Sequence, residues 1–157
     1  MRILSWNIRA GGGRRVEGIE AQLQRWAPDV VALSEYRATA PSQRLAKNLA
    51  GMGFAHQLAT SSAKLPAVNS LLVASRWPVR RLWVRGSLAD SNRWLLLEVL
   101  TPHPFILGVM HVPNRVTGRK RPFMDALLDL AVKWRRGRAL FVGDTNSGRI
   151  GVDEESP

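Results

Sequence analysis

The first third of the chain alternates between short apolar runs and one helical repeat. Residues 2–8 alternate apolar and polar side chains and predict a strand, which the glycines at 11–13 end. A helical repeat follows and ends before Pro28; its apolar positions are Val16, Ile19, Leu23 and Trp26. Asp29 then begins a short strand that continues through the apolar residues 30–33. This order predicts a buried β-α-β unit at the start of the fold.

The middle of the chain is dominated by strands. A helix is expected at 42–51, and strands are expected at 54–60, 69–75, 80–85, 93–100 and 105–112. The last two elements are a helix and a strand. The helix has its apolar face at Phe123, Leu127, Leu130 and Trp134, and the strand covers 138–142. Helices that alternate with strands, followed by consecutive strands, predict an α/β protein with a mixed sheet.

The length and composition predict one domain. The chain has 157 residues, of which 45% are hydrophobic, and this is enough to bury a core. We expect the domain to cover residues 1–150. The segment 151–157 is short, acidic and without periodicity, and it is expected to be a disordered tail.

The residue types that are absent restrict the chemistry. The sequence contains no cysteine, which excludes disulfides, thiolate metal sites and cysteine nucleophiles, and leaves oxygen and histidine as metal ligands. The lack of cysteine also fits a reducing cytoplasm, where we expect the protein to act. The N-terminal residues have the features of neither a signal peptide nor an anchor. The longest purely apolar run, Leu95–Leu97, is too short for a transmembrane segment.

The charge of the chain is strongly positive. Lysine and arginine number 23 against 12 acidic residues, which gives a net charge of +11. The basic residues gather at 14–15, 80–81, 115–121 and 133–138. This pattern favours a polyanionic partner, with nucleic acid as the first candidate. A solvated basic surface without a partner would have the same composition, and net charge alone leaves both interpretations open.

Polar residues with metal or phosphate chemistry follow four of the apolar strands. They are Asn7, Glu35, His111, Asp144 and Asn146. Each residue by itself could be an ordinary cap, turn or structural residue. Together they predict a site for Mg²⁺ and a phosphate group, because ligand sites of α/β folds gather at the carboxyl ends of strands and carboxylate and amide oxygens suit a hard cation.

Five segments in order resemble the motifs of the endonuclease/exonuclease/phosphatase family. They read ILSWNI, VVALSEYR, NSLLVASRWPV, GVMHVPN and LFVGDTNSG, and they span residues 3–148. The resemblance implies a two-sheet α/β sandwich with helices on the outside and a metal-dependent phosphodiesterase activity. A nuclease acting on nucleic acid is the first expectation, since the chain is basic.

The same resemblance implies roles for individual residues. Glu35 would bind the divalent cation, Mg²⁺ or Mn²⁺, with Asn7 and Asp144 beside it. Asp144 would also position or deprotonate the attacking water, and His111 and Asn146 would contact the scissile phosphate. Two further residues, Asn114 and Arg37, are candidates for substrate contact.

The sequence departs from the family pattern at its end. The family closes with strands that deliver an Asp and a Ser-Asp-His motif, and no Ser-Asp-His occurs here. We therefore expect an incomplete domain that lacks the C-terminal strands. Two other functions stay open: a catalytically inactive fragment that binds nucleic acid or a partner, and a hydrolase of a phosphodiester other than nucleic acid. Oligomeric state is not predicted by any feature.

The tryptophans allow two interpretations. Trp77, Trp83 and Trp94 could stack on bases, but tryptophan in a strand more often belongs to the core. We expect them to be core residues.

Overall fold

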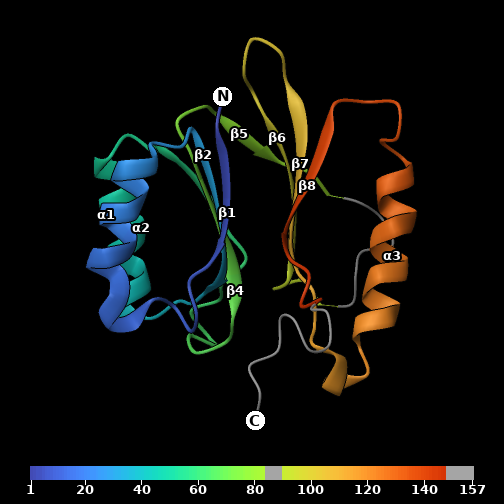
Figure 1. Ribbon diagram of the computed structural model, residues 1–157, viewed down its shortest axis with the longest axis horizontal. Coiled ribbons are helices and arrows are strands. Elements are labelled where there is room, and N and C mark those ends of the chain that lie inside the picture. Colours follow the sequence, from blue (N-terminus) through green and yellow to red (C-terminus); the bar gives the residue numbers. More distant parts are fainter. Residues whose placement is uncertain (84–89, 148–157) are drawn as a thin grey trace.

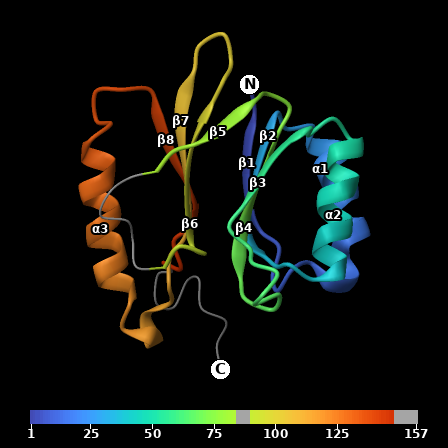
Figure 2. The same cartoon turned by 180° about the vertical axis from the view of Figure 1, so that it is seen from behind.

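The chain folds into four layers, helix, sheet, sheet and helix (Figure 1). A computed structural model describes residues 1–83 and 90–147. Within these residues the strands form two four-stranded sheets that pack face to face, and the view from behind shows the same layers (Figure 2). The predicted α/β sandwich with outer helices is confirmed. The predicted tail at 151–157 lies outside the described residues.

The first sheet contains the N-terminal strands in the order β1-β2-β4-β3. Strands β1 and β2 are parallel, whereas β4 is antiparallel to both β2 and β3. The elements of this half are β1 (Ile3–Asn7), η1 (Gly13–Arg15), α1 (Val16–Trp26), β2 (Val30–Tyr36), α2 (Ala40–Gly51), β3 (His56–Ala59) and β4 (Ser70–Ser75). Helices α1 and α2 cover the outer face of this sheet (Figure 1).

The second sheet has the order β5-β6-β7-β8. Its last two strands are parallel and its other neighbours are antiparallel. The elements are β5 (Val79–Arg81), β6 (Trp94–Val99), β7 (Phe105–His111), η2 (Arg115–Thr117), α3 (Lys120–Val132) and β8 (Ala139–Asp144). Helix α3 covers the outer face of the second sheet (Figure 1). Each sheet thus has one pair of parallel strands at an edge, β1 and β2 in the first sheet and β7 and β8 in the second.

The apolar run of β2 is explained by burial on both faces. Val30 and Ala32 point into the core between the sheets, whereas Val31 and Leu33 point into the core under the helices. All four side chains are at most 1% exposed. A strand between two packed layers needs apolar residues at every position, which is why it reads as a continuous run.

Two sequence predictions need correction. The strand expected at 80–85 is β5, which ends at Arg81, and residues 84–89 lie outside the described part. Helix α3 ends at Val132, and the backbone N–H of Trp134 donates to Ala131 O in a tighter turn. The helical spacing of Trp134 reflects packing of its ring on Phe141, with ring centroids 6.5 Å apart.

The interpretation of the tryptophans as core residues is right for only one of the three. Trp94 stacks on Phe141 with ring centroids 6.0 Å apart and packs against the core beneath α3. Trp77 is 37% exposed, and Trp83 is 84% exposed with the Arg81 guanidinium over its ring. Both lie at or beyond the ends of strands, where no layer covers them.

Candidate active site

The carboxyl ends of two parallel strand pairs, one pair from each sheet, meet at one end of the sandwich. Asn7 ends β1, and Glu35 lies one residue before the end of β2. In the other sheet, His111 ends β7 and pairs in register with Asp144 at the end of β8. Sheet packing brings the two pairs together, so the predicted proximity of these four residues is confirmed.

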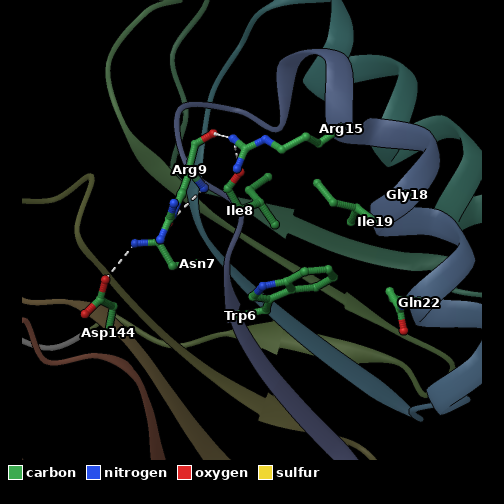
Figure 3. A pocket seen from close by; sticks show the side chains of 9 residues that line it. All are labelled: Trp6, Asn7, Ile8, Arg9, Arg15, Gly18, Ile19, Gln22 and Asp144. Carbon is green, nitrogen blue, oxygen red and sulfur yellow. Dashed lines mark hydrogen bonds between the residues drawn. The ribbon is translucent and has the colours of Figure 1, made fainter. Parts of the chain in front are cut away.

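Asn7 connects the two carboxylates of the site. Its Nδ2 donates to Glu35 Oε1 at 3.0 Å and to Asp144 Oδ2 at 2.6 Å. The second of these hydrogen bonds joins residues from different sheets (Figure 3). Asn7 Oδ1 accepts from the backbone N–H of Arg9 at 2.8 Å, so the amide is held from both sides. The two acids are therefore fixed on either side of one amide group.

Glu35 sits on a β-bulge within β2, whereas the sequence predicted a position just after the strand. The pairing of β2 with β4 shifts between Ser34 and Tyr36, and Glu35 has φ +58°. This left-handed conformation is unfavourable for a residue with a side chain, and such strain gathers at functional sites. The bulge changes the direction of one side chain in an otherwise alternating strand, so that Glu35 reaches the site.

The turn after β1 encloses the Glu35 carboxylate. The backbone N–H of Ala10 donates to Glu35 Oε2 at 2.8 Å, and that of Gly11 donates to Glu35 O at 2.7 Å. Burial alone would raise the pKa of Glu35, but the hydrogen bonds from Asn7 and Ala10, with the attraction of His111, lower the pKa below its ordinary value. Glu35 is consequently an anion at neutral pH.

His111 is held in one orientation by Arg93. His111 is only 4% exposed, and Arg93 Nη1 lies 3.2 Å from His111 Nδ1. Guanidinium nitrogens only donate, so Nδ1 accepts and the proton of the neutral ring is on Nε2. That nitrogen lies 3.9 Å from both Glu35 Oε1 and Asp144 Oδ2. Burial and the charge of Arg93 lower the pKa of His111 against the attraction of the two acids, which keeps the ring neutral at pH 7.

The loop after β8 orients Asp144 and Asn146. The backbone N–H of Asn146 donates to Asp144 Oδ1 at 2.9 Å, and Asn146 Nδ2 donates to Val112 O at 2.5 Å. Lys120 Nζ donates to Asn146 O at 2.6 Å. Asn146 therefore lies beside the site, tied to the segment that follows His111.

The two predicted substrate-binding residues lie apart from these contacts. Arg37 follows β2, and its Nε donates to Asn69 Oδ1 at 2.6 Å. Asn114 is exposed at the start of η2, where its carbonyl accepts from Thr117 Oγ1. Their roles in substrate contact stay predictions.

Sequence reasoning missed two residues that organise the site, Arg93 and Lys120. Lys120 belongs to the basic segment 115–121, whereas Arg93 stands outside the basic segments. Both contact residues that are distant in sequence, so no local pattern could have assigned them. Arg93 directly precedes β6, the antiparallel neighbour of the strand that carries His111. The strand pairing is the only signal that could have indicated its contact.

A groove opens beside the carboxylates, between β1 and α1 (Figure 3). It has a volume of about 610 Å³, and Asn7 and Asp144 form one end of it. Its other lining residues are Trp6, Ile8, Arg9, Arg15, Gly18, Ile19 and Gln22. Arg15 Nη2 donates to the carbonyls of Ile8 and Arg9 at 3.0 and 2.6 Å, which fixes the wall next to Asn7. The cluster of Asn7 and Asp144 is thus open to a ligand from this side.

The donor set of the site suits a hard divalent cation. Glu35 and Asp144 supply carboxylate oxygens, and Asn7 can supply an amide oxygen once its amide turns over, because its Nδ2 faces the two acids in this structure. Among residues 1–83 and 90–147, no group of three or more His, Cys, Asp and Glu side chains has the spacing of a metal centre. Mg²⁺ is compatible with this smaller set, because it keeps several waters and is commonly bound by only one or two carboxylates.

The fold and site define a class of proteins: two-sheet α/β sandwiches with an acidic centre at the carboxyl ends of strands from both sheets. The model of the endonuclease/exonuclease/phosphatase family matches residues 4–151, and the chain belongs to that family. Among proteins of curated function, none matches the sequence significantly. In the described part of the chain, no helix has the length and apolar character needed to cross a bilayer.

Solved structures with the same fold include those of a TDP2, an AP endonuclease and a sphingomyelinase. Danio rerio TDP2, complexed with a single-strand DNA product, has 21% identity and a TM-score of 0.70, over 95% of this chain and 62% of its own. An AP endonuclease from Archaeoglobus fulgidus has 17% identity and a TM-score of 0.72, over 98% and 60%. Sphingomyelinase C from Streptomyces griseocarneus has 17% identity and a TM-score of 0.68, over 98% and 66%. The chain thus spans 60% to 66% of the length of these structures.

Proposed function

We propose that the protein is a divalent-metal-dependent hydrolase of phosphodiester bonds whose substrate is nucleic acid. The observation that carries the proposal is the arrangement of Glu35 and Asp144 on either side of Asn7, with the buried His111 3.9 Å from both acids. Family membership supports a hydrolase of phosphate esters. The net charge of +11 supports a polyanionic substrate.

The site residues divide the work of the reaction. Glu35, Asp144 and Asn7 would hold Mg²⁺ or Mn²⁺, which when bound polarises a phosphoryl oxygen and neutralises the charge that develops during attack. Asp144 positions a water and accepts its proton as the oxygen attacks phosphorus. The bond to the leaving oxygen breaks in line with the attack. His111 donates its Nε2 proton in a hydrogen bond to a nonbridging oxygen, which stabilises the pentacoordinate transition state.

The similar structures support nucleic acid as the substrate class. TDP2 was solved with a DNA product, and a second neighbour is an AP endonuclease. Sphingomyelinase has the same fold, so a phosphodiester of a lipid is the second candidate. The cytoplasmic location expected from the sequence stays a prediction, as do the roles of Asn114 and Arg37.

Turnover of the 157-residue chain tests the proposal. Labelled single-stranded DNA, RNA, sphingomyelin and bis(p-nitrophenyl) phosphate are incubated with the protein in Mg²⁺ and in EDTA. We expect cleavage of a nucleic acid in Mg²⁺ only, and a loss of at least about 100-fold in Asp144→Asn, since the variant loses both a cation ligand and the proton acceptor. Asp129→Asn, the same change at an exposed position of α3, serves as the matched control.

Each other outcome contradicts part of the proposal. Hydrolysis of sphingomyelin alone would show that the substrate is a lipid phosphodiester and not nucleic acid. Turnover that persists in EDTA would exclude a divalent metal from the reaction. No turnover with any substrate, together with retained DNA binding, would establish the inactive binding protein as the function of this chain.

A further inference from the structure

A cationic pocket lies between η2 and the first turn of α3. It has a volume of about 520 Å³, and three of its five lining residues are basic. The lining residues are Arg115, Gly118, Lys120, Arg121 and Met124. The segment from Val112 to Met124 contains four basic residues and no acidic one. Arg115 and Arg121 are exposed, whereas Lys120 is half-buried.

The positive charge of this pocket is not neutralised by the described residues. Lys120 Nζ donates to Asn146 O at 2.6 Å and to Ser147 Oγ at 2.9 Å, and both acceptors are neutral oxygens. Over residues 1–83 and 90–147, the ion pairs involve neither Lys120 nor the two arginines of the pocket. Three cations that face one concavity without a carboxylate favour an anionic ligand.

The pocket is close to the candidate active site along the chain and in space. Arg115 follows His111 by four residues, which span at most about 14 Å. Lys120 contacts the loop that carries Asn146, directly after Asp144. Phosphates of one stacked strand recur every 3.4 Å or so along the axis, so about four nucleotides reach from the reaction centre to the pocket.

We propose that the Arg115–Lys120–Arg121 pocket binds a backbone phosphate of a nucleic-acid strand, within about four nucleotides of the bond that is cleaved. The location of the cleaved bond rests on the proposed function, whereas phosphate binding itself does not. Arginine guanidinium groups bind phosphate oxygens with two parallel hydrogen bonds, and such contacts position a strand without reading its sequence.

A membrane surface is the competing anionic ligand, and the lining of the pocket argues against it. Binding at a bilayer interface needs aromatic or large apolar side chains beside the cations. Among the described residues, Met124 is the only apolar side chain that lines the pocket, and the exposed apolar residues near it, Val116 on η2 and Leu128 and Val132 further along α3, are not aromatic. The exposed tryptophans belong to other segments: Trp26, Trp77 and Trp83.

Two double variants with equal loss of charge test the pocket. Arg115→Gln/Arg121→Gln removes two cations of the pocket. Arg25→Gln/Arg44→Gln removes two exposed arginines of α1 and α2, which cover the opposite side of the molecule (Figure 1). The probe is a fluorescein-labelled single-stranded DNA oligonucleotide, and its affinity is measured in EDTA at several salt concentrations, so that metal-dependent cleavage cannot interfere.

We expect the pocket variant to bind the oligonucleotide about tenfold more weakly, because hydrogen bonds to a charged group are lost. Its salt dependence should decrease by roughly one phosphate contact for each arginine removed. The control should lose less than about twofold. Both variants should keep the melting temperature of the unchanged protein, since all four arginines are exposed.

Equal losses of affinity in the two variants would overturn the proposal, because they would reflect net charge alone. Loss of binding to phosphatidylserine vesicles, with unchanged DNA affinity, would assign the pocket to a membrane and also overturn it. Turnover separates phosphate binding in the pocket from the proposed function. If no variant hydrolyses any phosphodiester but the tenfold difference in DNA affinity is present, the proposed function fails and the phosphate pocket stands.

Discussion

Glu35 and Asp144 are two anions placed on either side of a single amide. Two carboxylates this close repel each other, and the repulsion is relieved here by the Nδ2 group of Asn7, which donates to both. A hard cation would relieve it more completely, because it neutralises charge that the amide only screens. The stability of the protein should therefore depend on divalent metal, and it should do so through Glu35.

Addition of Mg²⁺ is expected to raise the melting temperature, and Glu35→Gln to abolish the rise. A ligand that binds only the folded state at one hundred times its dissociation constant stabilises it by about 2.7 kcal/mol. For a chain of this size this corresponds to roughly 5–11 °C. Thermal melts in EDTA and in millimolar Mg²⁺ measure the shift.

The substitution is conservative in shape, since glutamine keeps one oxygen for the hydrogen bonds that Glu35 accepts from Asn7 or Ala10. Glu17→Gln, an exposed charge in the first turn of α1, is the matched control and should keep the full Mg²⁺ response. If Glu35 only capped the turn beside it, Glu35→Gln would lower the melting temperature equally with and without Mg²⁺, and the metal site would be refuted.

Tyr36, the residue after Glu35, predicts a loss of stability at alkaline pH. Burial raises the pKa of Tyr36 above its ordinary value of about 10. The folded state therefore favours the protonated phenol. This contribution to stability is complete below the pKa of the unfolded chain and is lost as the pH rises through the higher pKa of the folded protein.

The chain contains a single tyrosine, so near-ultraviolet tyrosinate absorbance reports Tyr36 alone. We expect its titration midpoint to lie above that of the chain in denaturant. Tyr36→Phe should abolish the absorbance change and weaken the alkaline decline of the unfolding free energy. Coinciding midpoints for the folded and denatured chains would show that the phenol is not desolvated.

Strands β7 and β8 place His111 and Asp144 side by side, and glycines permit their close approach. A Cβ on Gly108 would lie 2.5 Å from the Phe141 ring, and this absence of a side chain lets Phe141 and Trp94 stack over the strand. Gly143 has φ +149°, and a Cβ there would lie 1.9 Å from Met110 O in the neighbouring strand. Backbone atoms of a paired strand cannot move aside as the end of a flexible side chain can.

Gly143→Ala is consequently expected to destabilise the protein by about 1–3 kcal/mol or more, because β8 has to shift away from β7. Chemical denaturation gives the change in unfolding free energy. Since Asp144 is the next residue, the Mg²⁺-dependent rise in melting temperature should also become smaller.

Gly51→Ala is the control for this change, since a Cβ at the end of α2 meets no atom within 4 Å. It should leave stability unchanged or raise it slightly, because alanine has the higher helix propensity. Equal effects of the two substitutions would mean that β8 tolerates a side chain at this position, and that the clash with Met110 does not restrain it.

The whole molecule carries a net charge of +11, and its basic residues lie on both helical layers as well as in the loops near the site. A polyanion is attracted by the whole charge distribution, while only a few arginines and lysines contact its phosphates directly. Attraction by the whole charge distribution occurs in any basic protein. Direct contacts with phosphates displace a defined number of counterions, which the salt dependence of binding measures.

The logarithm of the affinity for nucleic acid should accordingly fall linearly with the logarithm of the salt concentration. The expected slope is about −0.9 for each phosphate contacted on duplex DNA and about −0.7 on a single strand. Fluorescence anisotropy with one labelled duplex and one labelled strand gives both slopes. Affinity that is constant between low and moderate salt would exclude an electrostatic interface.

Local pattern was sufficient to predict most elements and the four residues that meet at the carboxyl ends of the strands, but not Arg93 and Lys120 beside them. Burial on one face produces the helical repeat of α1 and the alternation of some strands, and burial on both faces produces the apolar runs of β2 and β4. The spacing of apolar residues along the sequence therefore reports which faces are buried. Asn7, His111 and Asp144 could be assigned because they end apolar runs. For these residues the position in the element determines the position in the site.

The tertiary structure decided what depends on contacts between distant parts of the chain. Asn7 and Asp144 are 137 residues apart in sequence, and their hydrogen bond exists only because two sheets pack together. The bulge that turns Glu35 into the site, the contact of Arg93 with His111 and the exposure of Trp83 likewise follow from strand pairing and layer packing. Periodicity reports which face of an element is buried, but it does not report what that face meets.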